Sequence, residues 1–170
     1  MMCGGDISVF IDVMESPKLI IIGGGKIGYP LAKIADILGF RVTVVDSTEE
    51  VANKERFPMA EEIIVNKDLA KALDQVKVNP NDYVVILTGN PHHDYIALKK
   101  MAKKNLAYLG FLGSPVKTKT LLEKLKTEEG IDLSKKKIFH SPVGLNIYAV
   151  TPEEIALSIL AEIVKERRSL

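Results

Sequence analysis

The amino-acid sequence predicts an α/β fold: a Rossmann-like, doubly wound parallel sheet in three layers, with an extra N-terminal strand and a C-terminal helix. The first observation is that short aliphatic runs alternate with helical patterns, which is typical of a parallel sheet covered on both faces. The second is a glycine-rich turn, GGGKIG, between the first run and the first helical pattern. The third is a composition that is 46% hydrophobic but only 6% aromatic, which indicates an aliphatic core.

The 170 residues, 1–170, are expected to form one domain, since single domains usually have about 100–150 residues and seldom divide below about 250. The predicted strands are Lys18–Ile22, Arg41–Asp46, Glu61–Val65, Asp82–Thr88 and Leu106–Leu112. The predicted helices are Lys26–Leu38, Asp68–Val76, Tyr95–Lys104, Ser114–Lys126 and a last one that begins after Thr151. Near-continuous apolar runs such as the first strand are typical of strands buried on both faces.

Specific residues mark the ends of three helices. Gly39 follows the last apolar residue of the first helical pattern and is predicted to end that helix. At the last helix, Thr151, Pro152 and Glu154 match an N-cap, a first-turn proline and the glutamate partner of a capping box. Asp94 is predicted to cap the helix that follows it.

Three segments lie outside the alternation. Ile7–Val13 is predicted to be the extra strand, within an N-terminal extension over residues 1–16. Thr127–Lys137 is predicted to be a solvated loop. Phe139–Asn146 is rich in turn residues and is expected to fold back over the carboxyl edge of the sheet, with His140 satisfied by the backbone.

Composition excludes several classes of protein. There are 23 Lys and Arg against 22 Asp and Glu, so the net charge of +1 gives no global field to attract nucleic acid or an anionic membrane. Cys3 is the only cysteine, which excludes a disulfide framework and a cysteine-rich zinc site. No apolar run approaches the ~20 residues that span a bilayer, and the first residues do not resemble a signal peptide. We therefore expect a soluble, cytoplasmic protein.

The glycine-rich turn has the spacing G-x-G-x-x-G of dinucleotide-binding turns. It comprises Gly23, Gly24, Gly25, Lys26, Ile27 and Gly28. Gly23 permits the tight turn, Gly25 lets a pyrophosphate approach the backbone, and Gly28 allows close packing of helix and strand. A phosphate group would then bind free N–H groups at the helix N-terminus.

Asp46 ends the second strand, 18 residues after Gly28, near the place of a ribose-binding acid. A carboxylate there accepts from a free 2′-hydroxyl and repels a 2′-phosphate, so the pattern favours NAD or a related adenosine nucleotide over NADP. The alternative is that the glycines serve only the turn and that Asp46 caps the segment after it.

Polar residues follow the fourth and fifth strands, whose carboxyl ends form the ligand-binding edge of such sheets. We expect Thr88, Gly89 and Asn90 to line a ligand. His92, His93 and Asp94 could act as acid, base or metal ligands, but two adjacent histidines cannot easily face one metal and no third strong ligand is evident nearby.

After the fifth strand come Gly113, Ser114 and Lys117, with Ser114 as a helix cap. Lys117 and Lys119 oppose the helix dipole, which suggests either an anionic partner or a solvated lysine face. No Ser-His-Asp or Cys-His set is evident, so no catalytic residue is predicted.

Together the motifs resemble the C-terminal Rossmann domain of the XdhC/CoxI family, the xanthine dehydrogenase accessory factors. The resemblance rests on IIGGGKIG, RVTVVD, DYVVILT, YLGFLGSPVKTKTLLEKL and SPVGLNIYAVTPEEIALSILAEIV, in the family's order over nearly the whole chain. Two stretches depart from the family's pattern. Thr88 is followed by Gly-Asn-Pro where the family often has His-x-His, and Pro115 and Val116 stand where it often has arginines.

The resemblance implies an accessory protein that binds the molybdenum cofactor as cargo, helps to sulfurate it and delivers it to a molybdenum hydroxylase apoenzyme. It also implies a nucleotide fingerprint at Gly23, Gly25, Gly28 and Asp46. Residues 1–16 resemble the tail of the family's N-terminal domain, which a separate protein could supply. The resemblance does not decide between two functional classes: such an accessory protein, or a small NAD-dependent oxidoreductase or NAD-sensing module. The broad apolar face of the last helix predicts a homodimer.

Overall fold

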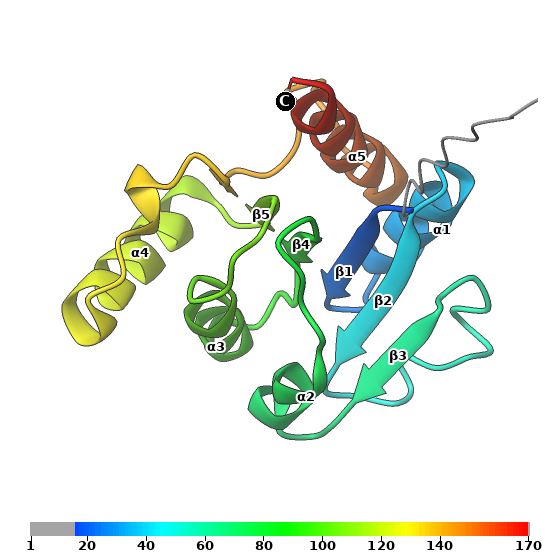
Figure 1. The fold of residues 1–170 in the computed structure, drawn as a ribbon, viewed down its shortest axis with the longest axis horizontal. Coiled ribbons are helices and arrows are strands. Elements are labelled where there is room, and N and C mark those ends of the chain that lie inside the picture. Colours follow the sequence, from blue (N-terminus) through cyan, green and yellow to red (C-terminus); the bar gives the residue numbers. More distant parts are fainter. Residues whose placement is uncertain (1–15, 170) are drawn as a thin grey trace, which may run out of the picture.

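The structure is a computed structural model that describes residues 16–169, and its centre is one sheet of six parallel strands (Figure 1). The strands are β1 (Lys18–Ile22), β2 (Arg41–Asp46), β3 (Glu62–Val65), β4 (Tyr83–Ile86), β5 (Tyr108–Phe111) and β6 (Phe139–His140). Their spatial order is β3-β2-β1-β4-β5-β6, so the direction of winding reverses between β1 and β4. The predicted parallel, doubly wound sheet is confirmed.

Helices cover both faces of the sheet and make the three layers. They are α1 (Gly28–Ile37), α2 (Leu69–Gln75), α3 (Pro91–Met101), α4 (Pro115–Glu129) and α5 (Pro152–Arg168). Helices α1 and α5 pack together on one face (Figure 1), and α2, α3 and α4 cover the other. Leu19 and Ile21 belong to the hydrophobic core between the sheet and α1 and α5. Ile20 and Ile22 belong to the core between the sheet and α2, α3 and α4. All five residues of β1 are buried, which explains its continuous apolar run.

Most of the predicted helix signals are confirmed. Gly39 follows the last turn of α1 at a φ of 77°, a left-handed conformation that glycine adopts readily. The Thr151 hydroxyl accepts from the Glu154 N–H, and the Glu154 carboxylate accepts from the Thr151 N–H, so the capping box at α5 is complete. Ser114 caps α4 as expected.

Several boundaries were predicted wrongly. Helix α1 begins at Gly28 rather than Lys26, because the glycine turn continues through Ile27. Helix α3 begins at Pro91, and its cap is Asn90, whose side chain accepts from two backbone N–H groups. The cap predicted at Asp94 is therefore wrong, since this residue lies within the first turns of α3 and is fully buried.

The segment after α4 is more ordered than predicted. Helix α4 extends to Glu129, and a short 3-10 helix spans Leu133–Lys135, where Thr127–Lys137 was expected to be a solvated loop. Phe139–His140 then adds a sixth strand that the turn-rich composition of this stretch did not reveal. The extra strand predicted at Ile7–Val13 lies outside the described residues.

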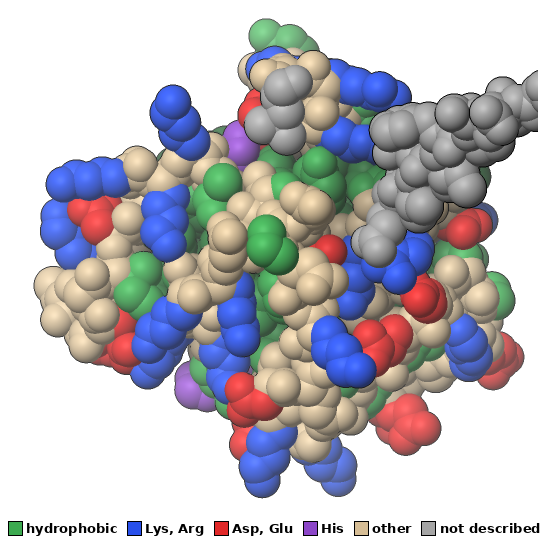
Figure 2. All heavy atoms as spheres, in the orientation of Figure 1, with side chains coloured by type: hydrophobic (Ala, Val, Ile, Leu, Met, Phe, Trp, Pro, Cys, Tyr) green, Lys and Arg blue, Asp and Glu red, His purple; other side chains and the backbone are tan. Residues whose placement is uncertain are grey.

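Charged side chains of both signs lie on the surface. On the face shown in Figure 2, basic and acidic side chains are interspersed over much of the molecule, in keeping with the net charge of +1. Between residues 16 and 169, no helix is long and apolar enough to cross a membrane.

Candidate functional site

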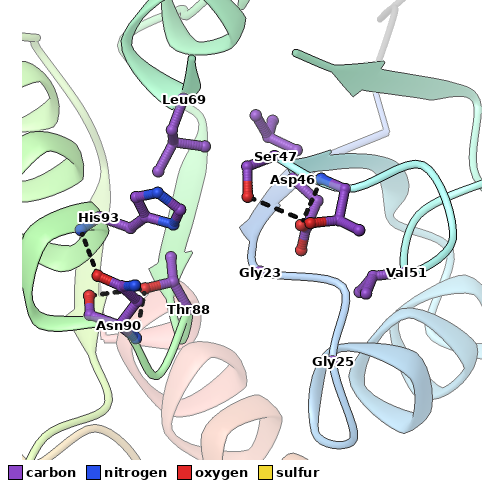
Figure 3. Close-up of a pocket in the computed structure, with 11 residues that line it drawn as sticks. Gly23, Gly25, Asp46, Ser47, Val51, Leu69, Thr88, Asn90 and His93 are labelled. Carbon is purple, nitrogen blue, oxygen red and sulfur yellow. Dashed lines mark hydrogen bonds between the residues drawn. The ribbon is translucent and has the colours of Figure 1, made fainter. Parts of the chain in front are cut away.

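A pocket of about 320 Å³ lies at the carboxyl ends of β1, β2 and β4, where the direction of winding reverses (Figure 3). Open α/β sheets bind their ligands at this position, because the loops on either side diverge there. The residues that line it are Gly23, Gly25, Val45, Asp46, Ser47, Thr48, Val51, Leu69, Thr88, Asn90 and His93. Small-molecule pockets usually measure about 300–1,000 Å³, so this one suits a nucleoside-sized group.

The glycine turn forms one wall of the pocket. Gly23 has a φ of 113°, and a Cβ there would stand 2.7 Å from the carbonyl oxygen of Leu87. A Cβ on Gly28 would stand 2.2 Å from the carbonyl oxygen of Gly23. Both positions therefore need glycine for the fold itself, as the sequence predicted for the turn and for close packing.

Gly25 differs from its neighbours because a Cβ there would meet no atom within 4 Å. It lines the pocket (Figure 3). The backbone N–H groups of Gly25, Lys26 and Ile27 have no hydrogen-bond acceptor among residues 16–169. Unpaired donors at the start of a helix, beside a glycine with free space, are the features that an anionic group requires.

Asp46 holds the glycine turn and also faces the pocket. Its Oδ2 accepts from the N–H of Gly24 at 2.8 Å, and its Oδ1 accepts from the N–H of Thr48 at 3.0 Å. Each carboxylate oxygen has a second lone pair, so Asp46 can still accept a hydrogen bond from a ligand. Asp46 therefore caps the segment after β2, as the alternative interpretation predicted, and its carboxylate can still accept from a ligand. The ribose-binding role of Asp46 stays a prediction.

The loop after β4 forms the opposite wall. Thr88 and Asn90 line the pocket as predicted, whereas Gly89, at a φ of 72°, makes the turn between them and is not among the lining residues. The side chain of His93 points toward the pocket near Leu69 (Figure 3). The sequence allowed His93 to act as an acid, a base or a metal ligand. Within the described residues no group of three His, Cys, Asp or Glu could hold a metal ion.

The residues predicted after β5 do not join this pocket. The Ser114 hydroxyl accepts from the N–H of Lys117 at 3.3 Å, which is its capping role. A Cβ on Gly113 would stand 2.5 Å from the ring of Phe111, so this glycine allows close packing. Gly113 and Ser114 thus have structural roles after β5, and neither they nor Lys117 are among the residues that line the pocket. Their predicted part in ligand binding stays a prediction.

Lys117 has an anionic partner within the chain. Its Nζ donates to Oδ2 of the buried Asp94 at 2.5 Å, and the Thr88 hydroxyl donates to Oδ1 at 2.6 Å. The Asp94 side chain is fully buried, while that of Lys117 is 26% exposed. This ion pair relieves the conflict between Lys117 and the helix dipole without an external anion. Lys119 instead lies on the surface, with its Nζ 4.0 Å from Oε1 of Glu123.

A second polar cluster joins β5, β6 and α5. The Tyr108 hydroxyl and the Gly144 N–H donate to Oε2 of Glu162 at 2.5 and 3.0 Å, and Nδ1 of His140 lies 3.7 Å from Oε1. Burial opposes ionisation of Glu162, but these donors outweigh it and hold the pKa of Glu162 below its usual range. The partner of His140 is thus a carboxylate, and the expected backbone partner is wrong.

The fold and the glycine-turn pocket together define a Rossmann domain. More specifically, the chain belongs to the family of XdhC Rossmann domains, whose family model matches residues 19–163. This result confirms the resemblance drawn from the motifs.

The proteins to which the chain is similar include two curated proteins and one solved structure. It is 37% identical over 168 residues to the uncharacterized protein YqeB of Escherichia coli K12, covering 98% of this chain and 30% of that protein. It is 35% identical over 162 residues to a probable xanthine dehydrogenase subunit of Bacillus subtilis, covering 95% of this chain and 46% of that protein. The crystal structure of a xanthine dehydrogenase from Bacillus halodurans superposes with a TM-score of 0.80 at 36% identity, covering 91% of this chain and 43% of that one. The chain thus spans less than half the length of each relative.

Proposed function

We propose that this chain binds NAD or a related adenosine nucleotide at the glycine turn, and that it serves as an accessory protein in the maturation of a xanthine dehydrogenase-type molybdenum hydroxylase. The observation that carries the nucleotide proposal is the combination of open space at Gly25, unpaired N–H groups beside it and an available carboxylate at Asp46. The names of two relatives, both of which refer to xanthine dehydrogenase, support the accessory role.

The pocket suits the adenosine half of such a ligand in both chemistry and size. Asp46 would accept from a ribose hydroxyl, and the aliphatic side chains of Val51 and Leu69 offer apolar surface to a base. Asn90 uses its Oδ1 to cap α3, through bonds of 2.9 and 3.2 Å to the N–H groups of His92 and His93. Its side-chain NH₂ group remains a donor for the ligand.

We expect NAD(H) to bind more tightly than NADP(H), because a 2′-phosphate beside Asp46 would meet a carboxylate that two backbone N–H groups hold in place. Isothermal titration calorimetry of the purified chain with each dinucleotide measures this preference. Asp46→Asn should narrow the difference, since the amide carries no charge. Equal affinities of the unaltered chain for the two dinucleotides would contradict the role given to Asp46.

The proposed cargo is the molybdenum cofactor, and the proposed partner is the hydroxylase apoenzyme. The chain covers 30% and 46% of its curated relatives, so a separate protein resembling the family's N-terminal domain is a further proposed partner. A pterin cofactor carries a phosphate or a pyrophosphate, which is the same chemistry that the glycine turn offers. The chain would help to sulfurate the cofactor or deliver it, and would not itself turn over a substrate.

Reconstitution tests this role. Apo-hydroxylase mixed with molybdenum cofactor and a sulfur source should gain activity faster, or to a higher level, when this chain and an N-terminal-type partner are added. The matched control is Gly25→Val, which fills the proposed phosphate site and should remove the gain. No gain from the unaltered chain, together with oxidation of NADH by the chain and an added electron acceptor, would favour the oxidoreductase alternative.

We propose a homodimer in which the exposed part of α5 contacts a second copy of the chain. The predicted apolar face of α5 is mostly used within the chain, because Ala156, Ile159, Leu160 and Ile163 are buried in the core with α1. Leu157, at 51% exposed, is the large apolar side chain of α5 that faces outward. Light scattering coupled to size-exclusion chromatography should give twice the 18.7 kDa chain mass, and a monomer at tens of micromolar would exclude the dimer.

A further inference from the structure

Arg56 reaches the glycine turn from a distant part of the sequence. It belongs to the segment between β2 and β3, and its Nη2 donates to the carbonyl oxygen of Gly25 at 3.3 Å. This residue lies outside the Ser-Thr-Glu-Glu stretch that directly follows Asp46, where a basic residue would ordinarily be sought. The guanidinium therefore stands beside the one glycine of the turn that faces open space.

The position of Arg56 is fixed by packing. Its guanidinium carbon lies 5.7 Å from the ring centroid of Tyr29 and 5.8 Å from that of Phe57, and the two rings meet edge to face. Phe57 is fully buried, and a Cβ on Gly24 would stand 3.4 Å from its ring. The segment that carries Arg56 thus packs directly against the glycine turn. A guanidinium held this way loses little rotamer freedom when it binds a ligand.

Most of the donors of Arg56 are unused within residues 16–169. The bond to Gly25 is long and is the only hydrogen bond of its guanidinium there, although an arginine has five N–H donors. No carboxylate in this part of the chain forms an ion pair with Arg56. A half-buried cation beside three unpaired backbone donors makes the local chemistry complementary to a dianionic group.

We infer that Arg56 is a phosphate-binding residue, and that its guanidinium binds the pyrophosphate of the nucleotide held by the Gly23–Gly28 turn. This inference rests on the proposed nucleotide binding and adds to it the residue that recognises the charge. The backbone N–H groups position the phosphates, and Arg56 neutralises them. Its cation–π contacts with Tyr29 and Phe57 hold the guanidinium beside the turn.

A comparison of ADP with adenosine tests the inference, because the two ligands differ only in the pyrophosphate. Their dissociation constants are measured by calorimetry for the unaltered chain, Arg56→Gln, Arg56→Lys and Arg41→Gln. Arg41 is the first residue of β2 and so lies at the amino ends of the strands, opposite the pocket. Its Nη1 lies 3.7 Å from Oε1 of Glu61, so Arg41→Gln removes the same charge away from the pocket. Arg56→Gln should lower the preference for ADP over adenosine about tenfold, the effect of one hydrogen bond to a charged group. Arg56→Lys should retain part of this preference, and Arg41→Gln all of it.

Each other outcome overturns a specific statement. If the unaltered chain binds neither adenosine nor ADP, the proposed nucleotide binding itself is wrong. If it binds both and Arg56→Gln leaves the preference unchanged, the proposed function stands and the role of Arg56 is wrong. If Arg56→Gln weakens adenosine as much as ADP, the residue supports the loop rather than the phosphate. If Arg41→Gln lowers the preference for ADP over adenosine by the same factor, the effect is one of overall charge, and the inference is also overturned.

Discussion

Replacing Lys117 with methionine is expected to lower the free energy of unfolding by about 3 kcal/mol or more, because it leaves the buried carboxylate of Asp94 without its cation. The Thr88 hydroxyl would remain the one side-chain donor to this carboxylate among the described residues. Methionine fills much of the volume of the lysine stem, so the loss reports on the charge of Nζ, which also lies 5.9 Å from the ring centroid of Phe111, rather than on packing. Urea denaturation followed by circular dichroism measures the change.

Two further variants isolate the ion pair. Lys119→Met removes a surface lysine of the same helix whose side chain is 79% exposed, and it should change the stability by less than about 1 kcal/mol. Replacing Asp94 and Lys117 together with leucine and methionine removes both charges and should recover most of the stability lost in the single variant. A loss below about 1 kcal/mol in Lys117→Met would contradict the buried pair.

The second large effect is expected from Gly25→Val, which should reduce ADP binding below detection and leave the fold intact. A valine side chain here enters the open space in which the phosphates are proposed to lie, and its Cβ meets no protein atom within 4 Å. The variant should therefore keep the thermal unfolding midpoint close to that of the unaltered chain while calorimetry shows no heat of binding.

Gly23→Val provides the contrasting variant. At a φ of 113° and with a Cβ 2.7 Å from the Leu87 carbonyl oxygen, any side chain at this position strains the turn. It should lower the unfolding midpoint as well as abolish binding. If the Gly25→Val variant binds ADP with the same affinity as the unaltered chain, the nucleotide does not bind at this turn.

The alternation of apolar runs was enough to predict the sheet, because β1, β2, β4 and β5 are each buried on both faces. The N-caps at Ser114 and Thr151 could also be predicted from the sequence, because each residue precedes a proline at the first helical position. Asn90 precedes Pro91 in the same way, and that signal would have located the start of α3 correctly. Strand β6 has only two residues, too few for any period to appear.

The candidate site was predictable only where it follows the chain locally. Gly23, Gly25 and Asp46 lie within a known spacing, so their proximity could be expected from the sequence. The pair of Asp94 and Lys117 joins two helices across 23 positions. The place of Lys117 at a helix N-terminus suggested an anionic partner, but no pattern in either helix identifies Asp94 as that partner. Arg56 is separated from Gly25 by 31 positions and an irregular segment, so its contact with the turn depends on tertiary packing alone.

The most direct test of the account is a nuclear magnetic resonance titration of the ¹⁵N-labelled chain with ADP, which locates the ligand residue by residue. The account predicts that ADP shifts the amide resonances of Gly24, Gly25, Lys26, Ile27 and Thr48, with smaller changes at Asn90 and His93. Resonances in the last turns of α4 should stay unchanged and serve as the internal control. Shifts confined to a surface away from the glycine turn, or no shifts at millimolar ADP, would contradict the central claim that this turn binds a nucleotide.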